Sequence, residues 1–132
     1  MSITGPLKTS VQLLRGGEPA IGPGKAMVLD AIERTGSISA AGRDLGMSYR
    51  RIWLLVDSLN ADWREPVVSA RIGGGTSRGA SLTDFGRELL GRYRKLESDM
   101  VAAAEGEELD WLKAAIRSPG ERDGHGNERS GQ

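Results

Sequence analysis

Four consecutive residues, Ser48, Tyr49, Arg50 and Arg51, carry the side-chain chemistry of a surface that binds a polyanion. Guanidinium groups can pair with phosphate oxygens and with the guanine edge in the major groove of DNA. Tyr49 adds an exposed ring and a hydroxyl group. Ser48 can accept a hydrogen bond from the free backbone N–H groups that open a helix. The combination predicts a helix whose first turn faces a nucleic acid.

Two short serine-capped helices are predicted around this turn. Ser39 is expected to cap a helix over residues 40–45, and Ser48 a second helix over residues 49–60. Gly46 follows the first helix, where a left-handed residue ends a helix without steric cost. Such a pair with a three-residue turn is typical of a helix-turn-helix, in which the second helix enters the major groove. The shared core is expected to contain Ile38, Leu45, Met47, Ile52, Val56 and Leu59.

The distribution of charge tests the alternative, a plain helical hairpin with solvated arginines. The whole chain has 18 basic and 18 acidic residues. Residues 34–95 carry 11 basic and 6 acidic side chains, whereas residues 96–132 carry 4 basic and 9 acidic ones. A basic middle fits a polyanionic partner, so the charge pattern favours binding to DNA.

The segment before the two helices predicts a hairpin and a further helix. Apolar and polar residues alternate over residues 7–14, as in a strand, and Gly16–Gly17 form a turn to a short strand at residues 20–21. Residues 24–34 predict the first helix of a three-helix core, opened by Pro23.

A second hairpin is predicted after the two helices. Residues 67–72 are β-prone, residues 73–79 form a glycine-rich loop, and residues 80–82 can return as the partner strand. Behind a helix-turn-helix, such a hairpin is the wing of a winged helix, and Arg78 would contact phosphate. A merely flexible loop is the alternative. The spacing matches neither a P-loop nor a dinucleotide-binding motif.

A long helix capped by Thr83 is predicted through about residue 104. Its apolar stripe extends further than a small core could cover, so we expect a homodimer. In the alternative, an amphipathic segment at residues 109–116 folds back over the stripe of its own chain. The residues expected in the dimer interface are Leu89, Tyr93, Leu96 and Met100.

The composition argues against several other classes of protein. The chain has no cysteine and one histidine, His125, so we expect no metal site, no cofactor and no nucleophilic triad. No apolar run approaches the roughly 20 residues of a membrane span, and no signal peptide is recognisable. We therefore expect a cytoplasmic protein that is not an enzyme.

Several short motifs together resemble the N-terminal domain of ModE, a molybdate-responsive bacterial transcription regulator with a winged helix akin to that of LysR-type regulators. The motifs are Thr-Gly-Ser-Ile-Ser-Ala-Ala at residues 35–41, Gly-Met-Ser-Tyr-Arg-Arg-Ile-Trp at 46–53, the glycines at 73–75, and Leu-Thr-Asp-Phe-Gly at 82–86. The resemblance covers about residues 7–104. It implies a winged helix followed by a dimerising helix, and binding to palindromic operators of molybdate-transport and molybdoenzyme genes.

The resemblance has one departure. ModE proteins continue into small β-barrel domains that bind molybdate, and residues 105–132 contain no strands that could form them. We therefore expect no direct binding of molybdate by this chain.

The sequence thus predicts an α+β protein, mainly α with a small β-wing. Residues 1–82 would form a winged helix-turn-helix, residues 83–117 a long dimerisation helix and a short helix, and residues 118–132 a disordered tail. The predicted function is regulation of transcription through double-stranded DNA. The alternative is a winged-helix module that binds proteins. The candidate DNA-binding residues are Ser37, Ser39, Ser48, Tyr49, Arg50, Arg51 and Arg78, while Trp53 could serve the core or DNA.

Overall fold

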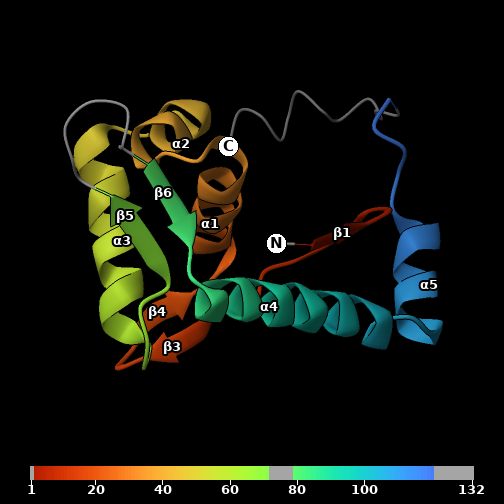
Figure 1. The fold of residues 1–132 in the computed structure, drawn as a ribbon. Helices are drawn as coiled ribbons and strands as arrows, with labels where there is room; N and C mark the ends of the chain where they lie inside the picture. The colour runs from red at the N-terminus through yellow and green to blue at the C-terminus, as the bar shows by residue number, and fades with distance from the viewer. Residues whose placement is uncertain (1, 72–78, 121–132) are drawn as a thin grey trace. The chain divides into compact units, whose positions relative to one another are not determined.

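The computed structural model describes residues 2–71 and 79–120 (Figure 1). It divides into two compact units, residues 1–101 and 102–132. The described part is mainly helical with small antiparallel sheets, which confirms the predicted α+β composition. None of its helices is long and apolar enough to cross a lipid bilayer. The predicted tail lies outside the described residues from residue 121 onward.

Two short hairpins open the chain. Strand β1 (Ser2–Thr4) pairs with β2 (Leu7–Thr9), and β3 (Leu13–Arg15) pairs with β4 (Glu18–Ile21), both antiparallel. The prediction of one strand over residues 7–14 is therefore wrong, and β1 was not predicted.

A contact with a distant helix accounts for the break between β2 and β3. The carbonyl of Val11 accepts a 2.7 Å hydrogen bond from the hydroxyl of Tyr93, and Val11 packs against the core. Burial raises the pKa of Tyr93 to about 12, so the hydroxyl stays protonated and able to donate. The backbone at Val11 therefore bonds to α4, and no strand continues from Thr9 to Leu13.

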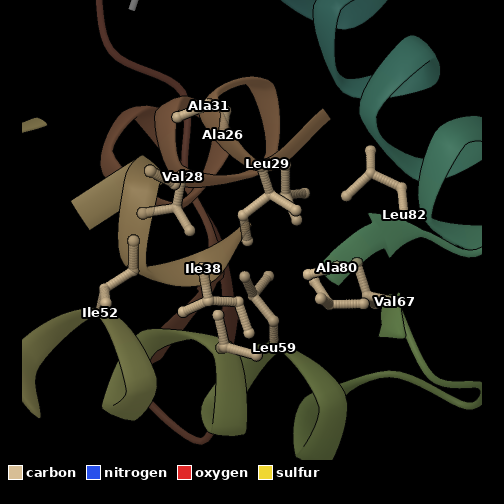
Figure 2. Close-up of a cluster of buried hydrophobic side chains, with 14 of the residues drawn as sticks. Ala26, Val28, Leu29, Ala31, Ile38, Ile52, Leu59, Val67, Ala80 and Leu82 are labelled. Atoms are coloured by element: carbon tan, nitrogen blue, oxygen red, sulfur yellow. The ribbon is translucent and has the colours of Figure 1, made fainter. Parts of the chain in front are cut away.

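Three helices build the core. They are α1 (Pro23–Thr35), α2 (Ile38–Leu45) and α3 (Tyr49–Asp62). Their inward faces meet in a cluster to which α1 contributes Leu29 and α3 contributes Ile52 and Leu59, all with 0% exposure (Figure 2). Burying each such side chain contributes about 1.5–3 kcal/mol. The six predicted core residues all belong to or pack against this cluster.

A third antiparallel hairpin covers one side of this core. Strand β5 (Val68–Arg71) pairs with β6 (Gly79–Leu82), in the register Val68 opposite Leu82. This confirms the predicted pairing, while the loop at residues 72–78, with Arg78, lies outside the described residues. The start of β6 is hydrogen-bonded to the C-cap residue of α1, because Ala80 N donates to Gly36 O at 2.9 Å.

The near end of β5 is tied to α3 by Asn60. Its Oδ1 accepts from the backbone N–H groups of Val67 and Val68 at 2.8 and 2.9 Å, and its Nδ2 donates to Val68 O at 3.1 Å. One side chain thus satisfies three backbone groups of the strand. The amide fixes where the hairpin leaves the helix.

Helix α4 (Asp84–Ala103) begins where β6 ends. Thr83 caps it as predicted, since its Oγ1 accepts from Gly86 N at 2.9 Å and donates to Pro66 O at 2.6 Å. Gly86 lies so close to the preceding strand that a Cβ atom there would be 2.2 Å from Val67 O. The start of α4 is therefore pressed against the base of the hairpin.

Ion pairs join α4 to α1. Arg87 Nε donates to Glu33 Oε2 at 2.9 Å, and this hydrogen bond lowers the pKa of Glu33 below its usual range. About two helical turns further on, Arg94 pairs with Asp30 of α1 and with Glu97 of its own helix. The Arg87–Glu33 and Arg94–Asp30 pairs are at least one-third exposed on both sides and contribute little each, so they orient α4 more than they stabilise it. Glu97, by contrast, is buried at 3% exposure.

The apolar stripe of α4 divides between the core and the surface. Tyr93 has 3% exposure and is buried in its own chain, whereas Leu96 and Met100 are 38% and 50% exposed. The part of the stripe that remains available to another molecule is therefore its far end. Helix α5 (Glu107–Ala115), which belongs to the second unit, buries none of its own residues.

The close approach at Gly86 generates a prediction about stability. Gly86→Ala should lower the free energy of unfolding by about 1–3 kcal/mol, because the added methyl group would overlap Val67 O and force the helix away from the strand. Urea denaturation followed by circular dichroism measures this change.

Gly91→Ala, on the same helix, is the matched control. Nothing lies within 4 Å of a Cβ atom at that position, so alanine should stabilise the helix by up to about 1 kcal/mol. Equal stability of the two variants would contradict the assigned role of Gly86.

Candidate nucleic-acid interface

The first turn of α3 presents the predicted basic residues. Tyr49 is 63% exposed, and Arg50 and Arg51 are exposed beside it. Within the described part of the chain, neither guanidinium group has a carboxylate partner within 4 Å. Ser48 caps the helix as predicted, because its Oγ accepts from Arg51 N at 3.1 Å. The turn is thus fixed in its backbone and free in its charged side chains.

The burial pattern of α3 explains why these side chains point outward. Ile52, Val56 and Leu59 are buried at 0, 2 and 0% exposure and define the inner face of the helix. At 3.6 residues per turn, Arg50 lies about 160° from Ile52. The core therefore holds α3 with Arg50 turned to solvent.

The crossing of α2 and α3 depends on a small residue. A Cβ atom at Gly42 would lie 3.2 Å from Ile52 Cγ2, closer than an ordinary van der Waals contact. The turn between the helices is closed by Met47 N donating to Gly42 O at 2.8 Å. Gly46, with φ of 68°, ends α2 as predicted.

The predicted cap of α2 is wrong. Ser37, not Ser39, is the N-cap, since its backbone is extended and its Oγ accepts from Ala40 N at 3.1 Å. Both serines satisfy the local sequence rule. Ile38 decides between them, because it is 5% exposed and reaches the core as the first residue of the helix. Ser39 lies half-buried inside the first helical turn.

Trp53 lies one turn beyond Tyr49 and belongs partly to the core. The two rings meet edge to face with centroids 6.1 Å apart, and Trp53 packs against the buried cluster. Its Nε1 atom is buried and makes no hydrogen bond within the described residues. The Trp53 ring thus connects the exposed Tyr49 ring to the core.

The basic residues around α3 differ in their availability. Arg34 donates to Asp44 Oδ2 at 2.9 Å, and this hydrogen bond lowers the pKa of Asp44 below its usual range. Arg43, by contrast, is exposed on α2 and has no carboxylate partner in the described part. Arg43 is thus a further unpaired cation of the described residues, and the sequence analysis did not select it.

Of the predicted DNA-binding residues, Ser48, Tyr49, Arg50 and Arg51 share one turn. Ser37 and Ser39 lie at the start of α2, and Arg78 is outside the described residues. The described residues contain no group of three or more His, Cys, Asp or Glu able to hold a metal ion.

The chain matches no protein-family model. It is nevertheless similar to ModE and Mop proteins. The molybdenum-pterin-binding protein MopA of Rhodobacter capsulatus is 36% identical over 114 residues, 86% of this chain and 41% of MopA. The molybdenum transport protein ModE of Azotobacter vinelandii is 37% identical over 84 residues, 64% of this chain and 31% of that protein.

A further relative is named as a regulator. The DNA-binding transcriptional dual regulator ModE of Escherichia coli K12 is 30% identical over 90 residues, 68% of this chain and 32% of that protein. The chain therefore spans between 31% and 41% of the length of these three relatives. These similarities agree with the resemblance inferred from the motifs.

The assignment of the α2 cap can be tested by a pair of serine variants. Ser37→Ala should lower the free energy of unfolding by about 0.5–2 kcal/mol, because Ala40 N loses its acceptor. Ser39→Ala removes a hydroxyl inside the helix and should change stability by less than about 0.5 kcal/mol. Thermal unfolding of both variants gives the comparison, and a larger loss for Ser39→Ala would restore the original prediction.

Proposed function

We propose that this chain is a sequence-specific DNA-binding transcriptional regulator of the winged helix-turn-helix class. The observation that carries the proposal is the first turn of α3, where Tyr49, Arg50 and Arg51 are exposed and the two arginines lack carboxylate partners in the described part. A rigid helix start with unpaired guanidinium groups suits base edges and phosphates in a major groove.

The arrangement of elements supports a winged helix. Helices α1, α2 and α3 form a three-helix core, and the β5–β6 hairpin is hydrogen-bonded to both α1 and α3. In this proposal the hairpin is the wing, and Arg78 contacts phosphate next to the groove. Residues 1–82 then form the DNA-binding domain, residues 83–117 the dimerisation segment, and residues 118–132 the tail.

The relatives supply the biological setting. They include a molybdenum transport protein, ModE, and transcriptional regulators that are also named ModE. We therefore propose that the target genes concern molybdenum. MopA and MopB are named as molybdenum-pterin-binding proteins. We carry over only the DNA-binding activity, for which the described residues offer a surface, and propose no molybdate site among them.

DNA binding can be tested with genomic fragments selected by the wild-type protein. Arg50→Ala should weaken binding to a selected site by about 1–3 kcal/mol and relax the preference at one base pair. Arg78→Ala should weaken binding to all sequences about equally and flatten the dependence on salt. Fluorescence anisotropy at several salt concentrations measures both effects.

The control is Arg92→Ala, which removes the same charge from an arginine that is paired with Glu88 on α4. It should bind the selected site like the wild type. If Arg50→Ala and Arg78→Ala also bind like the wild type, the assigned contacts are wrong. Failure to retain any DNA, or to bind heparin in a salt-dependent way, would instead favour a protein-interaction module.

We also propose a homodimer held together by the exposed part of the α4 stripe. Leu96 and Met100 are 38% and 50% exposed, and Leu89 packs only partly against the core. Tyr93, which was expected in the interface, is buried in its own chain and has little surface left for a partner. Two-fold symmetry would suit a palindromic operator.

The dimer predicts a specific response to charge. Leu96→Glu should shift the protein toward monomer in sedimentation velocity at micromolar concentration, because a carboxylate would be buried in an apolar seam. Ser98→Glu, on another face of the same helix, should remain dimeric. A wild-type monomer under these conditions would rule out the proposed interface.

A further inference from the structure

Leu54 breaks the pattern of α3. Ile52 and Val56, two residues before and after it, are 0% and 2% exposed, whereas Leu54 is 55% exposed. Two residues beyond Ile52 correspond to about 200° around the helix, almost directly opposite the core. An amphipathic helix normally carries polar residues on this face. The packing of the chain thus gives no reason for leucine here.

The neighbours of Leu54 on the outer face are charged. Arg50 precedes it by four residues, Arg51 by three, and Asp57 follows by three, and all three are exposed. Residues at these spacings are adjacent on the surface of a helix. Leu54 therefore lies on the second turn of the surface that the proposed function directs at DNA.

We propose that Leu54 reads the C5-methyl group of a thymine in the major groove. This inference rests on the proposed function. The thymine methyl is the apolar group that base pairs present in the major groove, and apolar side chains contact it directly. An apolar residue beside two arginines thus has a partner of matching chemistry in the same groove as the guanine edges that suit Arg50.

The geometry also limits where the thymine lies. Four residues of helix correspond to a rise of about 6 Å between Arg50 and Leu54. Successive base pairs are about 3.4 Å apart along one strand. A helix lying along the groove therefore places the thymine within about two base pairs of the base that Arg50 contacts.

Replacement of thymine by deoxyuridine tests the contact, because it removes the C5-methyl group and leaves the hydrogen-bonding groups unchanged. Thymines of a site selected by the wild-type protein are replaced one at a time. The wild type should lose about three- to tenfold in affinity at one thymine per half-site, in line with the burial of a single methyl group. Leu54→Ala should bind the thymine and uracil forms of that position equally well.

Leu14→Ala is the matched control, because Leu14 is 60% exposed on β3, outside the helix-turn-helix. It should show the full wild-type sensitivity to uracil. Thermal unfolding confirms that each variant is folded, and truncation of an exposed leucine should leave the midpoint nearly unchanged.

The outcomes separate this inference from the proposed function. If the wild type binds its site but no replacement of thymine changes affinity, or if Leu54→Ala keeps the sensitivity, the methyl contact is wrong and DNA binding stands. If the selected site has no thymine within reach of Arg50's base, the contact is likewise wrong. If the wild type binds no DNA fragment at all, the proposed function fails and this inference with it.

Discussion

The contact between Gly86 and Val67 is the constraint on which the arrangement of the first unit depends. A Cβ atom at Gly86, in the first turn of α4, would lie 2.2 Å from Val67 O, so the helix can pack this closely only because this residue is glycine. Thr83 holds the same point by capping the helix and donating to Pro66 O. Because Asn60 binds Val67 from the other side, the base of the hairpin is held between α3 and α4.

The candidate interface is held separately, at the other end of α3, where Ser48 caps the helix and Ile52 is buried in the core. The elements that position it use short-range hydrogen bonds, whereas its charged side chains take part in none of the ion pairs seen elsewhere in the described residues. Arg34, Arg87 and Arg94 each have carboxylate partners, while Arg50 and Arg51 have none there. Because the backbone of this turn is already fixed, only the arginine side chains have to be ordered when an anion binds, so less affinity is lost.

Local rules predicted the elements well, and long-range contacts account for the errors. Ser48, Gly46 and Thr83 identify helix ends because capping depends on a few neighbouring residues. The choice between Ser37 and Ser39 was wrong although Ile38 was expected in the core, because the capping rule by itself fits either serine. The break after β2 arises from a bond between residues 82 positions apart. Leu54 could have been noticed from periodicity alone, since it falls opposite the predicted core stripe.

The peptide unit of Gly36 has a consequence for how the fold can be divided. Its N–H donates to Ile32 O at 2.8 Å and ends α1, while its carbonyl accepts from Ala80 N at 2.9 Å and holds β6. Its φ of 75° is strained for any residue with a side chain. One glycine therefore serves the helix and the hairpin together. The hairpin is not an interchangeable module: a graft from another protein would have to reproduce this left-handed corner as well as the strands.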